Sequence, residues 1–250
     1  MKMIAVVVFI LSLCACAISP PAVAPASHMI TLPGQNSLVI LGVSARQSSR
    51  ANEVAIAKET AARKASMFHR VFATKTERQY IGVGFFDYIQ DSYSLVEYDE
   101  QLEKYMERLN FDEDKDVFRD ANGNVFIRFT YPVSFPGRIE YNFERDYSGR
   151  PGWVSRPPVE ISGFIAGVGR SGRLDRFADT VTQSYEAAAI AIASRMSTTM
   201  STEDTAHQNQ GTLNIDRKSE AVISNFLVLE TWEEPQTRAI FTLAIAGTAN

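Results

Sequence analysis

Cysteine is almost absent from this chain, which contains Cys14, Cys16 and no other among its 250 residues. Both lie near the beginning, so the rest of the chain can form no disulfide and offers no thiol for nucleophilic catalysis. Histidine is nearly as scarce: its three copies are His28, His69 and His207, and none has a second ligand at a metal-binding spacing such as i+4. We therefore expect no metal site and no cysteine chemistry.

Long hydrophobic runs and strong net charge are also missing. After residue 16 the longest apolar runs, Ile161–Val168 and Ala187–Ala193, are far shorter than the roughly 18 residues of a membrane-spanning helix. The formal net charge of −4 indicates neither nucleic-acid binding nor an electrostatic membrane surface. The composition, 45% hydrophobic and 22% charged, is that of a globular protein, with chain enough for one large domain or two domains of about 100 residues.

The first sixteen residues, MKMIAVVVFILSLCAC, have the pattern of a bacterial lipoprotein signal. Lys2 supplies a positive start, and the apolar run Ile4–Leu13 is too short for a permanent membrane helix. A processing site needs a small residue before the cut, and Ala15 meets this need for Cys16. We therefore predict a signal peptide over residues 1–15 and lipidation of Cys16. An ordinary signal peptide that is cut nearby is the alternative.

Residues 16–28 continue as the lipidated cysteine and a flexible tether, because the stretch AISPPAVAPASH is small and proline-rich and has nothing to build a core. Two or three acyl chains on Cys16, at about 0.8 kcal/mol per buried methylene, would anchor the chain firmly. Ala17, rather than an acidic residue, follows the cysteine, a pattern that resembles outer-membrane sorting in enteric lipoproteins. We expect an outer-membrane location, with the folded body in the periplasm.

The remainder of the chain repeats one order of elements. A glycine-containing strand at 38–43 precedes a helix whose apolar positions run from Val54 to Phe72, and a similar strand at 164–168 precedes a helix with a stripe from Leu174 to Met196. Spacings of three and four residues put each stripe on one helical face. These two long helices are therefore expected to cover sheets.

Each copy also ends in a hairpin with a short helix before it. In the first, 117–118 and 125–131 flank Asn122-Gly123, a strong type I′ turn signal, and the short helix is expected at 101–109. In the second, 227–232 and 239–245 flank the longer turn EEPQTR, and the short helix is expected at 217–226. Residues 80–96 are expected to be strand, with 200–215 as a polar counterpart.

These patterns predict an α+β fold of two tandem units, each a small, mostly antiparallel sheet covered on one face by a long and a short helix. The first domain is expected at 29–135 and the second at 159–250. Between them lies a linker, 136–158, rich in proline and arginine.

The second copy resembles a known family in three places. These are Pro151-Gly152-Trp153-Val154, then Ile165-Ala166-Gly167-Val168-Gly169, then Trp232 followed by AIFTLAI. Together with the alanine-rich helix and the lipobox, the lipoprotein processing motif Leu13-Cys14-Ala15-Cys16, they resemble the LPP-twenty family of small outer-membrane lipoproteins. This family includes FlgP-like, flagellum-associated proteins. The resemblance implies an envelope lipoprotein that assembles with other proteins, some members being thought to form rings around the flagellar base.

Several motifs allow a functional and a structural interpretation. The stretch Gly167–Gly172 matches G-x-G-x-x-G after a strand and before a helix, but no strand that ends in an acidic residue follows about 20 residues on, so we favour glycines that permit a tight turn. The acids of 112–120 lack the glycine and glutamate positions of a calcium loop, which favours solvated charge.

The aromatics of 80–98 form either a sugar-stacking surface or strand core. Trp153 and its neighbouring arginines form either a protein interface or a lid on the second domain.

No arrangement of a nucleophile and a base, such as G-x-S-x-G, is present, so we expect no catalytic residue, no cofactor and no enzyme activity. The sequence predicts a non-enzymatic structural or assembly component of the cell envelope. Its partners would be the membrane, through the acyl chains on Cys16, and other proteins or further copies of itself. The alternative is a periplasmic module that binds peptidoglycan or a small ligand in a groove between the domains, at residues that the sequence does not identify.

Overall fold

The computed structural model describes residues 29–31, 37–82, 88–120, 123–133, 139, 141–142, 144–200, 205–209 and 212–248. The predicted signal peptide, Cys16 and the tether lie outside these residues, and so does Asn122 of the predicted type I′ turn.

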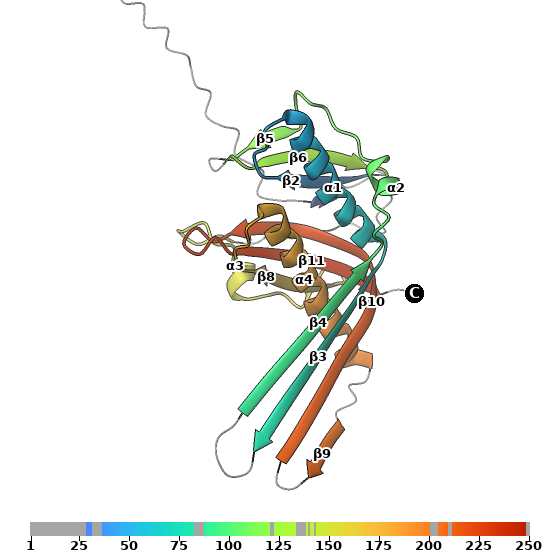
Figure 1. Cartoon of the computed structure of the whole chain (residues 1–250), viewed down its shortest axis with the longest axis vertical. Coiled ribbons are helices and arrows are strands. Elements are labelled where there is room, and N and C mark those ends of the chain that lie inside the picture. Colours follow the sequence, from blue (N-terminus) through green and yellow to red (C-terminus); the bar gives the residue numbers. More distant parts are fainter. Residues whose placement is uncertain are drawn as a thin grey trace, which may run out of the picture.

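The fold is α+β with two antiparallel sheets, as the sequence predicts (Figure 1). The first sheet has the order β1(Met29–Thr31), β2(Leu38–Ser44), β6(Val125–Tyr131), β5(Val117–Arg119), and α1(Arg50–His69) lies across it. Ser49 caps this helix, because its side chain accepts a hydrogen bond from the backbone N–H of Asn52. The short helix α2(Glu103–Met106) falls inside the predicted range 101–109.

The second sheet is larger and contains seven strands, with α4(Phe177–Met200) packed on it. Its order is β4(Tyr88–Tyr98), β3(Val71–Gly82), β10(Thr212–Glu233), β11(Ile240–Thr248), β8(Phe164–Ser171), β7(Glu160–Ile161), while β9(Thr205–Asn209) also pairs with β10. A single turn of helix, α3(Gly152–Ser155), precedes β7. Both predicted hairpins, β5–β6 and β10–β11, are confirmed.

The predicted short helix at 217–226 is wrong, because these residues belong to β10, a strand of 22 residues. Ala221 and Ile223 are buried whereas Val222 between them is 36% exposed, the alternation of a strand. The partner that stabilises this conformation is β3, whose Val71 pairs with Ile223 and whose Ala73 pairs with Ala221.

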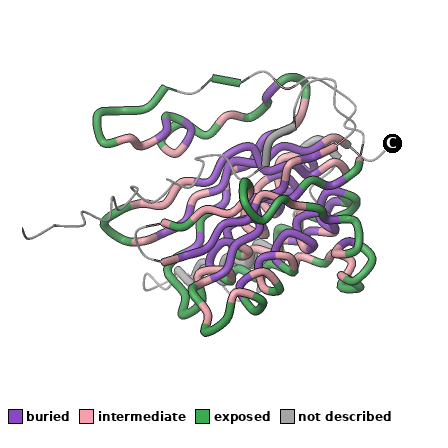
Figure 2. The backbone as a smooth tube through the Cα atoms, turned by 90° about the horizontal axis from the view of Figure 1, so that it is seen from above, coloured by how far each residue is buried: buried purple, intermediate pink, exposed green. Residues whose placement is uncertain are grey.

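This pairing joins the two halves of the sequence. β3 and β4 lie within 29–135 in sequence but belong to the sheet that contains β8, β10 and β11. One hydrophobic core runs through both halves, from Leu38 and Ala61 to Ala188 and Leu243, and Figure 2 shows the buried residues concentrated between the helices and the sheets. Two tandem units, each with its own sheet, are therefore not confirmed.

The glycines of the G-x-G-x-x-G stretch permit close helix packing rather than a turn. Gly167 and Gly169 lie inside β8 beneath α4. A Cβ at Gly167 would lie 2.8 Å from the carbonyl oxygen of Ala188, and one at Gly169 would overlap the carbonyl oxygen of Ser184. Gly42 of β2 is placed in the same way beneath Ala57 of α1. The predicted tight turn is thus corrected to a crossing point of helix and strand at Gly167 and Gly169, and Gly172 alone lies in the loop between β8 and α4.

Candidate functional site

A sheet without a covering helix projects from the body of the molecule (Figure 1). It consists of residues 74–82 of β3, 88–95 of β4, 212–220 of β10, and β9, and we call it the arm. The buried strand residues end at its base: Ala73 is fully buried, whereas Ser92–Leu95 and Arg217–Lys218 are exposed. Among the side chains that the structure describes, β pairing therefore continues past the last fully buried residues.

The two faces of the arm differ at its base. Val96, Ala73 and Ala221 share the face toward α4, and Ala73 and Ala221 are buried there. The opposite face carries the exposed apolar side chains Tyr93, Leu95 and Val222, which are 62%, 36% and 36% exposed. On this same face Lys218 and Glu220 form an ion pair of 2.6 Å. Tyr93 and Leu95 are neighbours on this face, and neighbouring exposed apolar side chains are a feature of contact surfaces.

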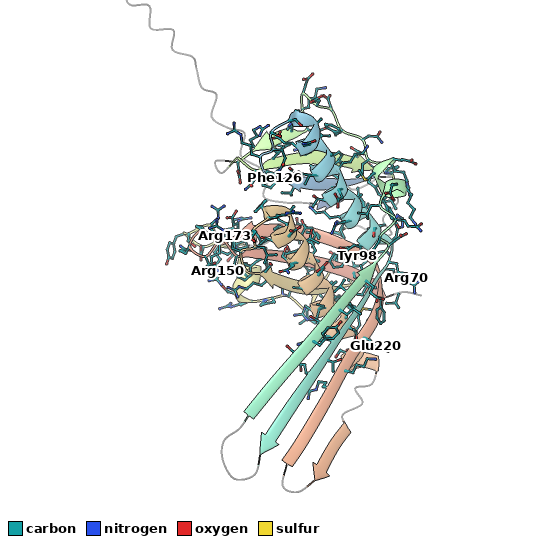
Figure 3. The ribbon with its side chains drawn as sticks, viewed as in Figure 1. Arg70, Tyr98, Phe126, Arg150, Arg173 and Glu220 are labelled. Atoms are coloured by element: carbon teal, nitrogen blue, oxygen red, sulfur yellow. The ribbon has the colours of Figure 1, made fainter. Side chains whose placement is uncertain are left out.

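A pocket of about 540 Å³ lies where the arm joins the body. It is lined by Ser66, Arg70, Phe72, Glu97, Tyr98, Asp99 and Tyr105. The carboxylate of Asp99 is already engaged, because Lys104 forms an ion pair with it and Tyr105 donates its hydroxyl over 3.0 Å. The hydrogen bond from Lys104 is the main reason that the pKa of Asp99 is lowered. Figure 3 shows Arg70 and Tyr98 at this junction, and Arg70 is exposed.

Tyr98 anchors the edge strand of the arm to α4. Its hydroxyl donates to a carboxylate oxygen of Glu186 over 3.4 Å. Burial is the main cause that raises the pKa of both groups. Because Glu186 belongs to α4 and Tyr98 ends β4, this contact fixes the arm at its base.

Lys64 is the most unusual charged residue of the body. Its side chain is 2% exposed, its ammonium group donates to the carbonyl oxygen of Leu41, and it stands 4.7 Å from the ring centroid of Tyr185. Burial lowers its pKa to about 7. Sequence reasoning missed this residue, although its spacing from Ala61 and Phe68 is that of the buried face of α1.

The predicted linker docks on β10 rather than separating two bodies. Trp153 is 1% exposed and donates its indole N–H to Glu230 over 2.8 Å, while Arg145 forms an ion pair with the other oxygen of the same carboxylate. Tyr141 donates to the carbonyl oxygen of Leu229 over 3.0 Å. This geometry agrees with the interpretation of Trp153 as a lid on the second sheet. Tyr147, in the same linker, is fully exposed.

Two hollows of about 350 and 360 Å³ share Phe177 in their linings, and the second lies between α4 and α1. The first includes Arg173, Glu233 and Arg238, and the second includes Glu59, Arg63, Arg176 and Asp179. The ring of Phe177 meets that of Phe126 edge-on, with centroids 6.0 Å apart. Figure 3 labels Phe126, which belongs to the first sheet, and Arg173, which lines the first hollow.

The other sequence candidates have ordinary structural surroundings. His69 shares a hydrogen bond of 2.9 Å with the Tyr131 hydroxyl, and burial and the nearby charge of Arg108 lower its pKa. Within the part of the chain that the model covers, no group of three His, Cys, Asp or Glu could hold a metal ion.

In the acidic stretch, Asp112 and Asp120 accept hydrogen bonds from the backbone N–H groups of Asp114 and Asn124. These contacts are typical of polar turns. The side chains of His207, Tyr80 and Tyr88 lie outside the described ones, and so do residues 85 and 86 entirely.

No helix among the described residues is long and apolar enough to cross a membrane. No family model, no curated protein and no solved structure matches the chain. The arm and the pockets are therefore interpreted from their own geometry.

Proposed function

We propose that this chain is an outer-membrane-anchored lipoprotein that acts without catalysis, as a structural or assembly component of the cell envelope, and that the arm is its contact surface. The observation that carries the proposal is the extension of the sheet beyond the core, where Tyr93 and Leu95 lie in solvent. The lipobox at Cys16 and the resemblance to the LPP-twenty family support the envelope location.

Physical chemistry favours a binding role for such an arm. Ordering a backbone residue costs roughly 1–2 kcal/mol, and at Ser92–Leu95 and Arg217–Lys218, which are exposed, little hydrophobic burial offsets this cost. An exposed sheet edge is also a template for pairing with another chain. A partner that covers the arm would bury its apolar side chains and satisfy the backbone groups along its edge.

Photo-crosslinking in intact cells tests the proposal directly. A photoreactive amino acid at Tyr93 is expected to give discrete protein adducts in the outer-membrane fraction, because this side chain stands in the arm. The same substitution at Tyr147, which is also exposed but lies in the linker, is the control and should give none. Adducts at neither position, or equally at both, would contradict a contact role for the arm.

Replacement of the lipidated residue tests the anchor. In Cys16→Ala the acyl chains have no attachment point, so the protein should move to the soluble periplasm or stay uncleaved in the inner membrane. Fractionation followed by immunoblotting measures this, with Cys14→Ala as the matched control that keeps its outer-membrane location. Unchanged fractionation of Cys16→Ala would refute the lipoprotein assignment. Motility of a deletion strain tests the flagellar association that the resemblance implies.

A second function, the binding of a peptidoglycan fragment or a small ligand, is favoured by the groove beside Phe177. Its two hollows carry both charge signs, with Arg176 and Asp179 on one side, as suits the amines and carboxylates of a wall peptide. Binding of soluble wall fragments should weaken in Arg176→Ala and persist in Arg156→Ala, which changes an exposed arginine that lines neither hollow. Equal binding by both variants would exclude the groove as the site.

A further inference from the structure

The outer edge of the arm is formed by β4, which lies at the end of the second sheet. Its 11 residues pair with β3 in one unbroken register, from Tyr98 opposite Val71 to Tyr88 opposite Ile81. No strand in the described part of the chain pairs with the other side of β4. One row of backbone N–H and C=O groups is therefore available to another strand.

This edge lacks several of the devices that usually prevent pairing between proteins. Natural edge strands carry charged side chains, above all lysine, or a proline or a bulge. β4 has no lysine, no arginine and no proline, its register shows no bulge, and its charged residues are Asp91 and Glu97. Ser92–Leu95 at its centre are exposed and uncharged. The edge is therefore suited to accept a strand.

We propose that β4 pairs antiparallel with β4 of a second copy of this chain, about a two-fold axis at Tyr93, so that two arms form one continuous sheet. This inference rests on the proposed function, since it names the partner that the arm contacts. The sequence of β4 itself indicates that the partner strand is a second copy of β4.

With Tyr93 on the axis, all 11 residues of β4 pair, and Tyr88 stands opposite Tyr98. The two acidic positions are then separated, because Asp91 stands opposite Leu95 and Glu97 opposite Ile89. An axis at Ser94 would place Asp91 opposite Glu97, and like charges directly opposite destabilise a strand pair. An axis at Ser92 would leave the last two residues of β4 unpaired. Charge and length thus select one register.

In the selected register the end of the partner strand arrives beside Tyr98, one of the residues that line the pocket of about 540 Å³. At the axis the two Tyr93 side chains meet on the face that also carries Leu95, and aromatic and aliphatic cross-strand pairs stabilise sheets. Pairing therefore covers Tyr93, the most exposed apolar side chain among those of the arm that the structure describes.

Disulfide trapping of the full-length chain in membranes tests the register. Residues directly opposite each other lie about 4.5–5.5 Å apart at Cα, within reach of a disulfide. Tyr93→Cys should form a cross-linked dimer under a mild oxidant. Ser92→Cys and Ser94→Cys should each stay monomeric alone, because identical positions are then about 8 Å apart, and should cross-link when both are expressed together. The parent chain, with Cys14 and Cys16, gives the background.

A charge test separates edge pairing from packing through the face. Tyr93→Glu places two carboxylates across the axis, so the detergent-extracted protein should self-associate at least about tenfold more weakly. Thr76→Glu is the matched control, because Thr76 lies directly opposite Tyr93 on the inner strand β3 and so adds the same charge one strand away from the edge. It should leave self-association unchanged.

The outcomes distinguish this inference from the proposed function. Loss of the dimer in Thr76→Glu as well as Tyr93→Glu would overturn β4 pairing while the arm remained a contact surface. Cross-linking of Ser94→Cys with itself would overturn the proposed axis at Tyr93, because identical residues lie opposite each other only at the axis. A parent chain that is monomeric in detergent and in membranes would also overturn it. In that case photo-adducts of Tyr93 with other proteins would leave the proposed function standing.

Discussion

At the scale of the residue, Lys64 shows how the core tolerates a cation. The ammonium group has one backbone acceptor and the face of Tyr185 in place of water, and a lysine desolvated in this way favours its neutral form. Its pKa of about 7 lies below the usual 10.5. Folding therefore releases a proton from Lys64 between these two pH values, and stability rises as the pH increases from about 7 to 10.5.

Lys64→Met should consequently stabilise the fold at neutral pH, by up to about 4 kcal/mol, and should reduce the gain in stability between pH 7 and 10. Methionine keeps the unbranched shape and removes the charge. Urea unfolding at the two pH values measures both effects, with Lys58→Met, a half-exposed position on the same helix, as the control. A Lys64→Met protein that is less stable at pH 7 than the parent would refute this account.

Trp153 is a second residue on which stability depends. Trp153→Ala removes a fully buried ring and the indole donor to Glu230, so the free energy of unfolding should fall by about 3–5 kcal/mol. Tyr147→Ala, in the exposed part of the linker, should change it little. Equal stability of both variants would show that the linker is not docked on β10.

At the scale of the element, the glycines of β8 set how closely α4 approaches. Gly169→Ala brings a methyl group onto the carbonyl oxygen of Ser184, so the helix must move away from the sheet, at a cost of about 1–3 kcal/mol or more. Gly172→Ala is the matched control, since a Cβ there meets no atom within 4 Å. Gly169→Ala should therefore unfold at a lower midpoint temperature than Gly172→Ala. Equal midpoint temperatures would contradict the packing argument.

Elements whose signals are local could be predicted from the sequence. The apolar spacing of α1 and α4 and the pairing of β5 with β6 depend on neighbours along the chain, and the sequence predicts all three elements within a few residues. β10 could not be predicted, because residues 217–226 contain good helix formers such as Lys218, Glu220 and Ala221. Their strand conformation depends on β3, with Thr74 and Ser219 in contact across 145 residues of sequence.

The sequence predicts the lipidation site but not the arm. The polar stretch 200–215 was expected as a strand counterpart, but nothing in its pattern indicates that it pairs outside the core to build an arm. An arm held by backbone hydrogen bonds leaves little periodic apolar signal. The lipidation site, by contrast, follows from a short motif around Cys16 and stays a prediction.

At the scale of the whole molecule, the shared core predicts cooperative unfolding. Because β3 and β4 belong to the second sheet and the hydrophobic core runs through both halves, the half 159–250 lacks two strands of its sheet and neither half has its core complete alone. Urea unfolding should show one transition, coincident by tryptophan fluorescence and circular dichroism. Two separated transitions would restore the division into independent domains at 29–135 and 159–250.

The long connection between β3 and β10 also has a consequence for biogenesis. A ribosome or a translocation channel delivers the chain from its N-terminus, so the β3–β4 hairpin emerges long before β10. During that delay β3 lacks its inner neighbour and both sides of the hairpin are open, which is the kind of intermediate that aggregates. Contacts this distant in sequence also slow folding. Newly delivered chains should therefore depend on a holding chaperone more strongly than the finished protein does.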